Sequence, residues 1–207
     1  MNTFLTACSL LPFYLLGTFP TGHLIAKSRG VDISTVGSGN VGATNVMRNL
    51  GKKAGVLTLL GDLCKGLLAV ALASALSGRF EYACYAGIAV VAGHCFSIPG
   101  KLKGGKGVAT ALGALLFLSP TAAVFVIAVF IAVLEMWKMV SLASVSATLS
   151  APVFTMLTGQ ADYLNYSLIA IALIITYRHH ANLTRIAQGK EPKRGAKTSS
   201  PAPGSPG

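Results

Sequence analysis

A glycine-rich segment near the middle of the first third of the chain carries residue types that hold phosphate groups. It runs from Gly37 to Asn45, reads GSGNVGATN and is followed by Arg48. Glycines let backbone N–H groups approach an anion closely, and hydroxyl and guanidinium groups add hydrogen-bond donors. The segment therefore predicts an anion-binding loop, although a tight loop whose polar residues cap a helix is the alternative. The candidate ligands are Ser38, Gly39, Asn40, Thr44, Asn45 and Arg48.

The same letters match the GxGxxG pattern of dinucleotide-binding folds, and Asp62 follows Gly42 by a suitable distance. That pattern requires a preceding β-strand inside a β-α-β unit. Here a long apolar segment precedes the glycines and Asp62 lies within the next one. Dinucleotide binding is therefore not indicated.

A second glycine-rich segment runs from Gly100 to Thr110 and reads GKLKGGKGVAT. It has the GxxxxGK spacing of a P-loop, but Gly107 stands where a hydroxyl residue should bind magnesium, so an NTPase is not indicated. A Gly-Gly turn between lysines at the start of a helix still suits a phosphate or an oxyanion. The alternative is that the lysines only orient the chain in a membrane. The candidate ligands are Lys103, Gly104, Gly105, Lys106 and Gly107.

Histidines supply the residues that could move a proton. His179 lies between Arg178 and Asn182 in a third polar segment, and His94 comes just before the second glycine-rich segment. An imidazole can act as a general base, although a single histidine more often caps a helix or lies at an interface. His23 is expected to be structural. Asp62 and Lys65 are spaced to share one face of a helix, which favours a structural ion pair and leaves a functional role open.

The elements that position these residues are apolar. The chain has 207 residues, of which 53% are hydrophobic and 11% charged, and its mean hydropathy is +0.64. Soluble domains have about a quarter of their residues charged. Apolar runs of membrane-crossing length also recur, which predicts an all-α, polytopic membrane protein. The runs lie near 4–26, 55–76, 82–99, 107–118, 120–137, 139–158 and 163–178.

The distribution of basic residues predicts how the chain crosses the bilayer. Fifteen of the 17 lysines and arginines fall on one side if there are seven spans, with the N-terminus outside and the C-terminus cytoplasmic. Treating 107–137 as one span would place Lys138 and the basic tail outside, so we predict two crossings separated at Ser119-Pro120. The net charge of +11 then reflects topology, and nucleic acid is not an expected partner.

We expect the longer inner connections, 27–54 and 99–107, to build the working site, because irregular backbone near a membrane is tolerated only against protein or water. Residues 1–189 are predicted to form one membrane domain and residues 190–207 a disordered tail. The four cysteines lie in or beside apolar runs without a CxxC pair, so neither a disulfide framework nor a metal site is indicated. The early Leu5-Thr6-Ala7-Cys8 sequence is not interpreted as a lipoprotein signal, and the first run is taken as a retained span.

The three polar segments together resemble a known family. Gly37 to Gly51 matches GSGNxGATNxxRxxG, Gly93 to Thr110 matches GHxFPxxxxFKGGKGVAT, and a VSLAS stretch ending at Ser144 precedes a match to YRHxxNIxRxxxGxE. This pattern is similar to that of the bacterial acyl-phosphate-dependent glycerol-3-phosphate acyltransferases, the PlsY family, over about residues 3–191. The chain departs from it at Ser34, Ser97, Leu102 and Leu183, which puts only the acyl-chain preference in question.

The resemblance implies transfer of an acyl group from acyl phosphate to the 1-hydroxyl of sn-glycerol 3-phosphate, giving lysophosphatidic acid and phosphate. It implies no cofactor, a site at the cytoplasmic face of the bacterial inner membrane, and a soluble phosphate acyltransferase that supplies the donor. It leaves open which loop binds which substrate, and whether a histidine or a substrate phosphate accepts the proton. Ser144 and Arg178 are further candidate ligands for a substrate phosphate. The expected catalytic residues are Ser38, Arg48, Lys106, His179, Asn182 and His94.

Two other classes of protein remain as alternatives. A transporter or flippase for an organic phosphate could use the same basic loops, but transport sites usually lie near the middle of the bilayer. A purely structural membrane subunit would give no reason for two glycine-rich anion loops. The gathering of polar motifs at one face favours chemistry at the membrane surface.

Overall fold

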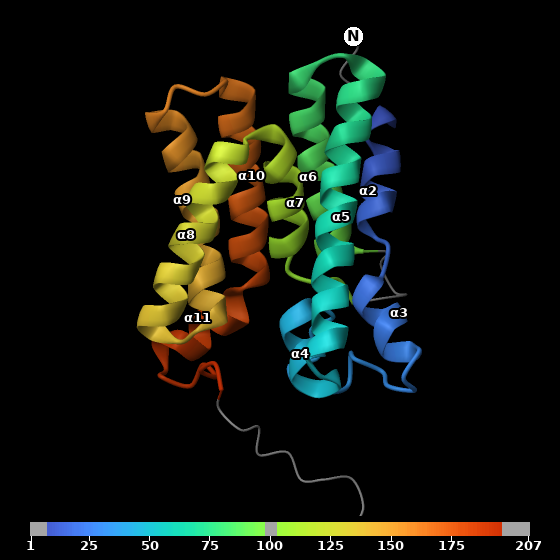
Figure 1. Ribbon diagram of the computed structural model, residues 1–207, viewed down its shortest axis with the longest axis vertical. Coiled ribbons are helices and arrows are strands. Elements are labelled where there is room, and N and C mark those ends of the chain that lie inside the picture. The colour runs from blue at the N-terminus through green and yellow to red at the C-terminus, as the bar shows by residue number, and fades with distance from the viewer. Residues whose placement is uncertain (1–7, 98–102, 196–207) are drawn as a thin grey trace, which may run out of the picture.

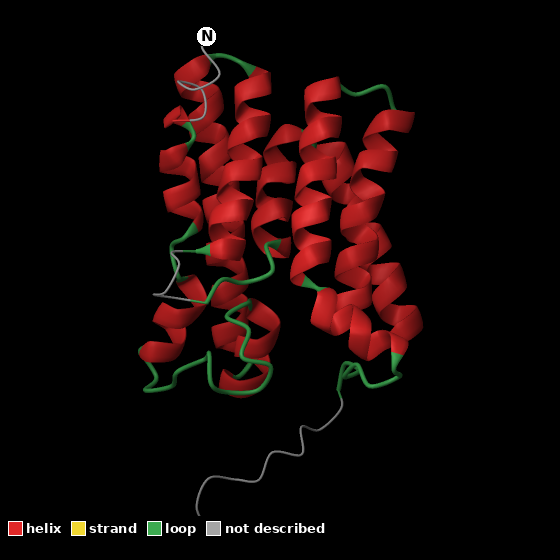
Figure 2. Ribbon diagram, turned by 180° about the vertical axis from the view of Figure 1, so that it is seen from behind, coloured by secondary structure: helices red, strands yellow, loops and turns green. Residues whose placement is uncertain are grey.

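The computed structural model describes residues 8–97 and 103–195, and the regular secondary structure in these ranges is helical. Figure 1 shows the helices as an upright bundle, and Figure 2 shows the same bundle from behind. In chain order the helices are α2 (Leu11–Gly17), α3 (Thr21–Lys27), α4 (Ala43–Leu50), α5 (Lys52–Ser77), α6 (Phe80–Phe96), α7 (Val108–Leu118), α8 (Pro120–Trp137), α9 (Val140–Leu157), α10 (Asp162–Arg178) and α11 (His180–Ala187).

The bundle has two groups of helices, which meet at α7 and where α10 packs against α6. Helices α2, α3, α5 and α6 form one group, and α8, α9 and α10 form the other (Figure 1). The short helices α4 and α11 and the turn between α8 and α9 lie at the same end of the bundle, which we call the loop end, and the turns that join α5 to α6, α7 to α8 and α9 to α10 lie toward the opposite end. Helix α7 begins well short of the loop end (Figure 1).

The outer surface has the character of a lipid-facing surface. Helices α5, α8 and α9 are each long and apolar enough to cross a membrane, and α6 and α7 are shorter apolar helices. Large apolar side chains face outward along these helices, including Leu72 and Leu76 on α5 and Val124 on α8, which are 50%, 80% and 68% exposed. Such exposure costs about 25 cal/mol per Å² in water but nothing comparable in a hydrocarbon.

The helices show where two of the predicted apolar runs are interrupted. The apolar stretch 107–137 is divided at Ser119, whose hydroxyl accepts a hydrogen bond from Ala122 N (3.3 Å) at the start of α8, as the sequence predicted. The run near 4–26, predicted as one span, is broken between α2 and α3. Pro20 cannot donate a helical hydrogen bond, and the Phe19 carbonyl accepts one from Lys65 Nζ (3.0 Å).

Glycines let helices of the first group and α7 approach one another closely. A side-chain carbon added at Gly66 of α5 would lie 2.0 Å from the Thr110 carbonyl oxygen, and one at Gly113 of α7 would lie 2.0 Å from that of Leu63. Small residues allow this approach in membrane bundles, where packing must replace the hydrophobic effect. The contact fixes α7, and therefore the loop before it, against α5.

A small apolar cluster anchors the first glycine-rich loop at the loop end. The buried residues Ile33 and Val41 of the loop pack with residues of α3, α4 and α5. The loop is thus held on the first group of helices at the loop end (Figure 1).

Candidate active site

The second glycine-rich segment forms a fixed turn between α6 and α7. Its described part, residues 103–107, is held from two sides. The Gly105 N–H donates to the His94 carbonyl (3.0 Å), and the Arg178 guanidinium donates to the carbonyls of Gly104 (2.9 Å) and Gly105 (3.0 Å). Gly107 takes a φ of +83° as the residue before α7, a conformation that favours glycine.

Lys106 is the first residue in a series of polar contacts that connects the segment before α7 to α11 and to the segment after it. Its ammonium donates to Asn182 Oδ1 (2.5 Å), and Asn182 Nδ2 donates to Glu191 Oε1 (2.6 Å). The same carboxylate accepts from Ser141 Oγ (2.7 Å) and from Arg185 Nε (2.8 Å). Lys106, Asn182 and Glu191 are therefore one hydrogen-bonded unit, which we call the site network.

Glu191 was not among the residues singled out from the sequence, although it is the last fixed letter of the third motif. The chain has only 6 acidic residues. A glutamate among the basic residues that follow Ala187 was therefore the sequence signal that could have identified Glu191 as a site residue. Residues 190–195, predicted as the start of a disordered tail, are held against the protein through Glu191 and through an Arg194–Glu135 ion pair of 2.8 Å. Residues 196–207 lie outside the described residues.

Several cations converge on the site network. Burial lowers the pKa of Lys106 to about 8; Glu191 opposes this shift, and the positive charges of Arg185, Arg178 and Arg48 add to it. A lysine whose pKa falls to this range is still largely protonated at neutral pH and is surrounded by excess positive charge. Such a site attracts phosphate anions.

His179 is almost fully buried beside this network, at 2% exposure. Its Nδ1 lies 2.8 Å from the Ile175 carbonyl oxygen; because a carbonyl only accepts, Nδ1 carries the proton and Nε2 is an acceptor in the neutral ring. Burial, reinforced by the charge of Lys106, lowers the pKa of His179 to about 4. The imidazole is therefore neutral at pH 7 and better suited to accept a hydrogen bond than to take a proton fully.

Asn45 and Asn40 organise the first glycine-rich loop. Asn45 is 3% exposed; its Oδ1 accepts from Ser38 N (3.0 Å), and its Nδ2 donates to the carbonyls of Val36 (3.1 Å) and Asn40 (2.8 Å). Asn40 Oδ1 accepts from Gly42 N (3.2 Å). Both amides thus shape the loop from within.

The ligand candidates that this loop presents are its exposed residues. Ser38, Thr44 and Arg48 are exposed, while Gly39 takes a φ of +65° at the turn. The positive charge of Arg48 helps to lower the pKa of Lys106, so the first glycine-rich loop contributes to the charge around the second.

The remaining predicted residues occupy other positions. Ser144 is buried and its hydroxyl donates to Val140 O (2.8 Å) in its own helix, whereas Ser141 reaches the site network. Lys103 is exposed beside a small cavity that His94 also lines. His94 belongs to a separate buried group, with its Nδ1 3.6 Å from Asp62 Oδ1. Residues 98–102, which include Lys101, lie outside the described residues.

A helical bundle with an apolar outer surface and basic, glycine-rich loops at one end has the features of an integral membrane protein with a site for anions. The family model for glycerol-3-phosphate acyltransferase matches residues 7–189. The chain belongs to this glycerol-3-phosphate acyltransferase family and is an acyltransferase of phospholipid synthesis. The family predicted from the three motifs is therefore confirmed.

Relatives and solved structures agree with this assignment. The chain is 43% identical over 180 residues to a glycerol-3-phosphate acyltransferase of Trichlorobacter lovleyi, which covers 87% of this chain and 93% of the relative. It is also 43% identical over 179 residues to the enzyme of Aquifex aeolicus, covering 86% and 93% of the two chains.

The fold is similar to that of a crystal structure of PlsY (YgiH), an integral membrane glycerol 3-phosphate acyltransferase, in its glycerol 3-phosphate form. The TM-score is 0.86, with 41% identity over 92% of this chain and 96% of that one. A lysophosphatidic acid form gives a TM-score of 0.84, with 42% identity over 91% and 95%.

Proposed function

We propose that this protein acylates the 1-hydroxyl of sn-glycerol 3-phosphate with acyl phosphate as the donor, releasing lysophosphatidic acid and inorganic phosphate. The observation that carries the proposal is the gathering of Lys106, Arg178 and Arg185 around the site network, with the charge of Arg48 from the first glycine-rich loop also acting on Lys106. Two phosphate-bearing substrates need two such loops. The glycerol 3-phosphate and lysophosphatidic acid forms of the similar structures support the acceptor and the product.

In this proposal each glycine-rich loop holds one phosphate. Lys106 and the N-terminal end of α7 bind one of them, because the helix end adds positive potential to that of the ammonium. Ser38, Thr44 and Arg48 bind the other, with Gly39, Asn40 and Asn45 holding the first loop in shape. The KM values of Lys106→Ala and Arg48→Ala for each substrate assign the loops, since a lost phosphate contact weakens one substrate selectively.

The acyl transfer itself needs orientation more than strong acid or base. The hydroxyl oxygen attacks the carbonyl carbon of the acyl phosphate, the bond from that carbon to the phosphate oxygen breaks, and phosphate leaves with the electron pair. The pKa of about 4 for His179 favours a substrate phosphate as the final proton acceptor, because the second pKa of a phosphate group is about 6. His179 Nε2 and Asn182 then orient the hydroxyl, and Lys106 stabilises the developing negative charge.

We further propose that the loop end faces the cytoplasm across the bacterial inner membrane. Seven crossings, with α2 and α3 together as the first, place the described basic residues other than Lys65 and Arg79 at that end. A soluble phosphate acyltransferase can then deliver acyl phosphate from the cytoplasm while the acyl chain remains in the bilayer. Membership in an acyltransferase family leaves the transporter alternative without support.

The test uses purified protein in detergent or lipid nanodiscs with glycerol 3-phosphate and palmitoyl phosphate. We expect release of inorganic phosphate and formation of lysophosphatidic acid, and no product when palmitoyl-CoA replaces palmitoyl phosphate. Product formation with palmitoyl-CoA alone would refute the proposed donor. Lack of product with either donor would refute the proposed reaction.

A further inference from the structure

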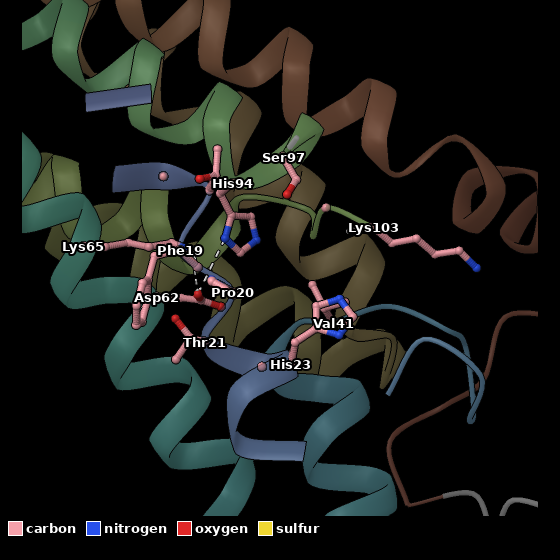
Figure 3. Close-up of a pocket in the computed structure, with 14 residues that line it drawn as sticks. Phe19, Pro20, Thr21, His23, Val41, Asp62, Lys65, His94, Ser97 and Lys103 are labelled. Carbon is pink, nitrogen blue, oxygen red and sulfur yellow. Dashed lines mark hydrogen bonds and ion pairs between the residues drawn. The ribbon is translucent and has the colours of Figure 1, made fainter. Parts of the chain in front are cut away.

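Three ionisable side chains meet inside the bundle in a group that the proposed reaction does not use. Lys65 Nζ lies 3.0 Å from Asp62 Oδ1, and His94 Nδ1 lies 3.6 Å from the same oxygen. The three residues are only 3% (Asp62), 5% (Lys65) and 8% (His94) exposed. Figure 3 shows them converging beside a small cavity, and we call them the buried triad.

The buried triad connects two consecutive helices to a more distant part of the chain. Asp62 and Lys65 come from α5 and His94 from α6. Lys65 also donates to the Phe19 carbonyl (3.0 Å), which becomes available where α2 ends and α3 has not yet begun. The triad therefore ties the break in the first span to the end of α6.

His94 carries this connection to the second glycine-rich loop. Its carbonyl accepts from Gly105 N (3.0 Å), and a side-chain carbon added at Gly105 would lie 2.1 Å from His94 Nε2. The imidazole is thus packed directly against the Gly105 backbone. Because Arg178 holds the Gly105 carbonyl from the other side, the loop residue next to Lys106 is clamped between two side chains.

Packing alone does not account for ions at this place. Charged groups within membrane spans are costly, and a buried ion pair is generally no more stable than apolar residues of the same volume. The arrangement has another consequence, since a charged carboxylate close to an imidazole favours one orientation of the ring. Asp62 Oδ1 lies 3.6 Å from His94 Nδ1 and acts on the ring through its charge, without a hydrogen bond, while Lys65 balances the charge of Asp62.

We propose that Asp62, Lys65 and His94 are positioning residues that hold Gly105, and through it Lys106, in the geometry that binds the substrate phosphate. The proposal rests on the proposed function of the Lys106 site. His94 acts here through the loop and does not touch the substrate. This differs from the proton-accepting role that its sequence position suggested.

The decisive variant replaces the ion pair by apolar side chains of similar size, Asp62→Leu with Lys65→Met. Removing both charges avoids an unpaired buried ion, so we expect a folded protein with a melting temperature close to that of the wild type. Without Asp62 the imidazole loses its orienting partner. We expect kcat to fall by about 10–100-fold, as for other residues that orient a ligating group, while KM for at least one phosphate substrate rises.

Two further measurements separate positioning from simple structural support. Hydrogen–deuterium exchange of the amides in the Gly104–Thr110 segment should become faster in the double variant, with no change in α8 and α9. His94→Asn, which keeps an amide near the position of Nδ1, should retain more activity than His94→Ala. The control is Thr58→Val in α5, since Thr58 is fully buried and donates only within its own helix, to Ala54 O.

Wild-type kinetics together with unchanged loop exchange in the double variant would overturn the proposal and leave only a structural ion pair. The exchange measurement needs no substrate. If the wild-type protein releases no phosphate, the proposed function fails by itself, and unchanged exchange in the loop still overturns the positioning role.

Discussion

The site network and the buried triad are both groups of charged and polar side chains next to the same loop, but they differ in charge balance. In the triad, one carboxylate faces one ammonium and a histidine inside the bundle. In the site network, one carboxylate is set against the positive charges of Lys106 and three arginines at the loop end. A balanced and sealed group can fix a backbone, whereas an unbalanced and accessible one can bind an anion.

Lys106→Ala should have the largest effect of the variants that test this difference. It removes the cation that donates to Asn182 and that the charge of Arg48 in the first loop also affects. Loss of one preorganised charged donor typically lowers kcat by about 100–1,000-fold, and we expect kcat/KM to fall at least that much in the phosphate-release assay. Lys138→Ala is the matched control, because Lys138 is exposed and pairs with Glu135, and neither residue belongs to the site network. A similar loss in both variants would contradict the special role of Lys106.

The sequence predicted the accessible site better than the sealed group. Lys106, Arg178, His179 and Asn182 were found from motifs because their residue types suit phosphate chemistry, and the structure brings them together. The ion pair of Asp62 and Lys65 was expected from their helical spacing. Its link to His94 was not, because that contact joins two helices and depends on how they pack.

The same limit applies to the fold. Helices α5 to α10 followed from apolar runs, since the length of such a run is a local property. The break of the first run depended partly on Pro20, a local signal, and partly on Lys65 reaching the Phe19 carbonyl from another helix. The inward-facing roles of Asn40 and Asn45 were likewise hidden, because a sequence shows which groups a loop contains but not which way they point.

His179→Ala should have the second-largest effect, a fall in kcat of about 10–100-fold, because it removes an acceptor that orients the hydroxyl. The contrast with a general base lies in the pH profile. Since the pKa of His179 is about 4, the wild-type rate should not change through pH 6–7 by titration of this ring. A limb with a pKa near 6.5 that disappears in His179→Ala would instead indicate a histidine base.

The upper limb of the pH profile tests the charge imbalance directly. The pKa of Lys106 is lowered to about 8, and the ammonium is the form that binds phosphate. We therefore expect kcat/KM, which reports the free enzyme, to decline as the pH rises through about 8. Lys106→Arg should be slower but should lack this limb, because arginine stays charged. A limb of the same position in Lys106→Arg would assign it to another group.

Glu191→Gln should shift that limb with a smaller loss of activity. The Glu191 carboxylate raises the pKa of Lys106 against the effect of burial, so its neutralisation should lower that pKa and move the decline below pH 8. The amide keeps the volume and one acceptor oxygen for Asn182 and Ser141. We expect a loss of about tenfold near pH 7 and a larger loss at pH 8. A limb that stays in place would mean that the carboxylate does not act on Lys106.

Ser141→Ala should have the smallest effect, and it tests whether the site network extends into α9. Ser141 Oγ donates to Glu191 Oε1 (2.7 Å). Among the described residues, this hydroxyl makes no hydrogen bond to either glycine-rich loop. A hydrogen bond to a charged group contributes about 1.5–3 kcal/mol, so its loss should reduce stability measurably but lower kcat only severalfold. Ser150→Ala is the control in the same helix, since its hydroxyl donates to Ala147 O. Equal kinetics for the two variants would place the edge of the site network at Glu191, and a loss only in Ser141→Ala would show that α9 helps to hold the carboxylate that tunes Lys106.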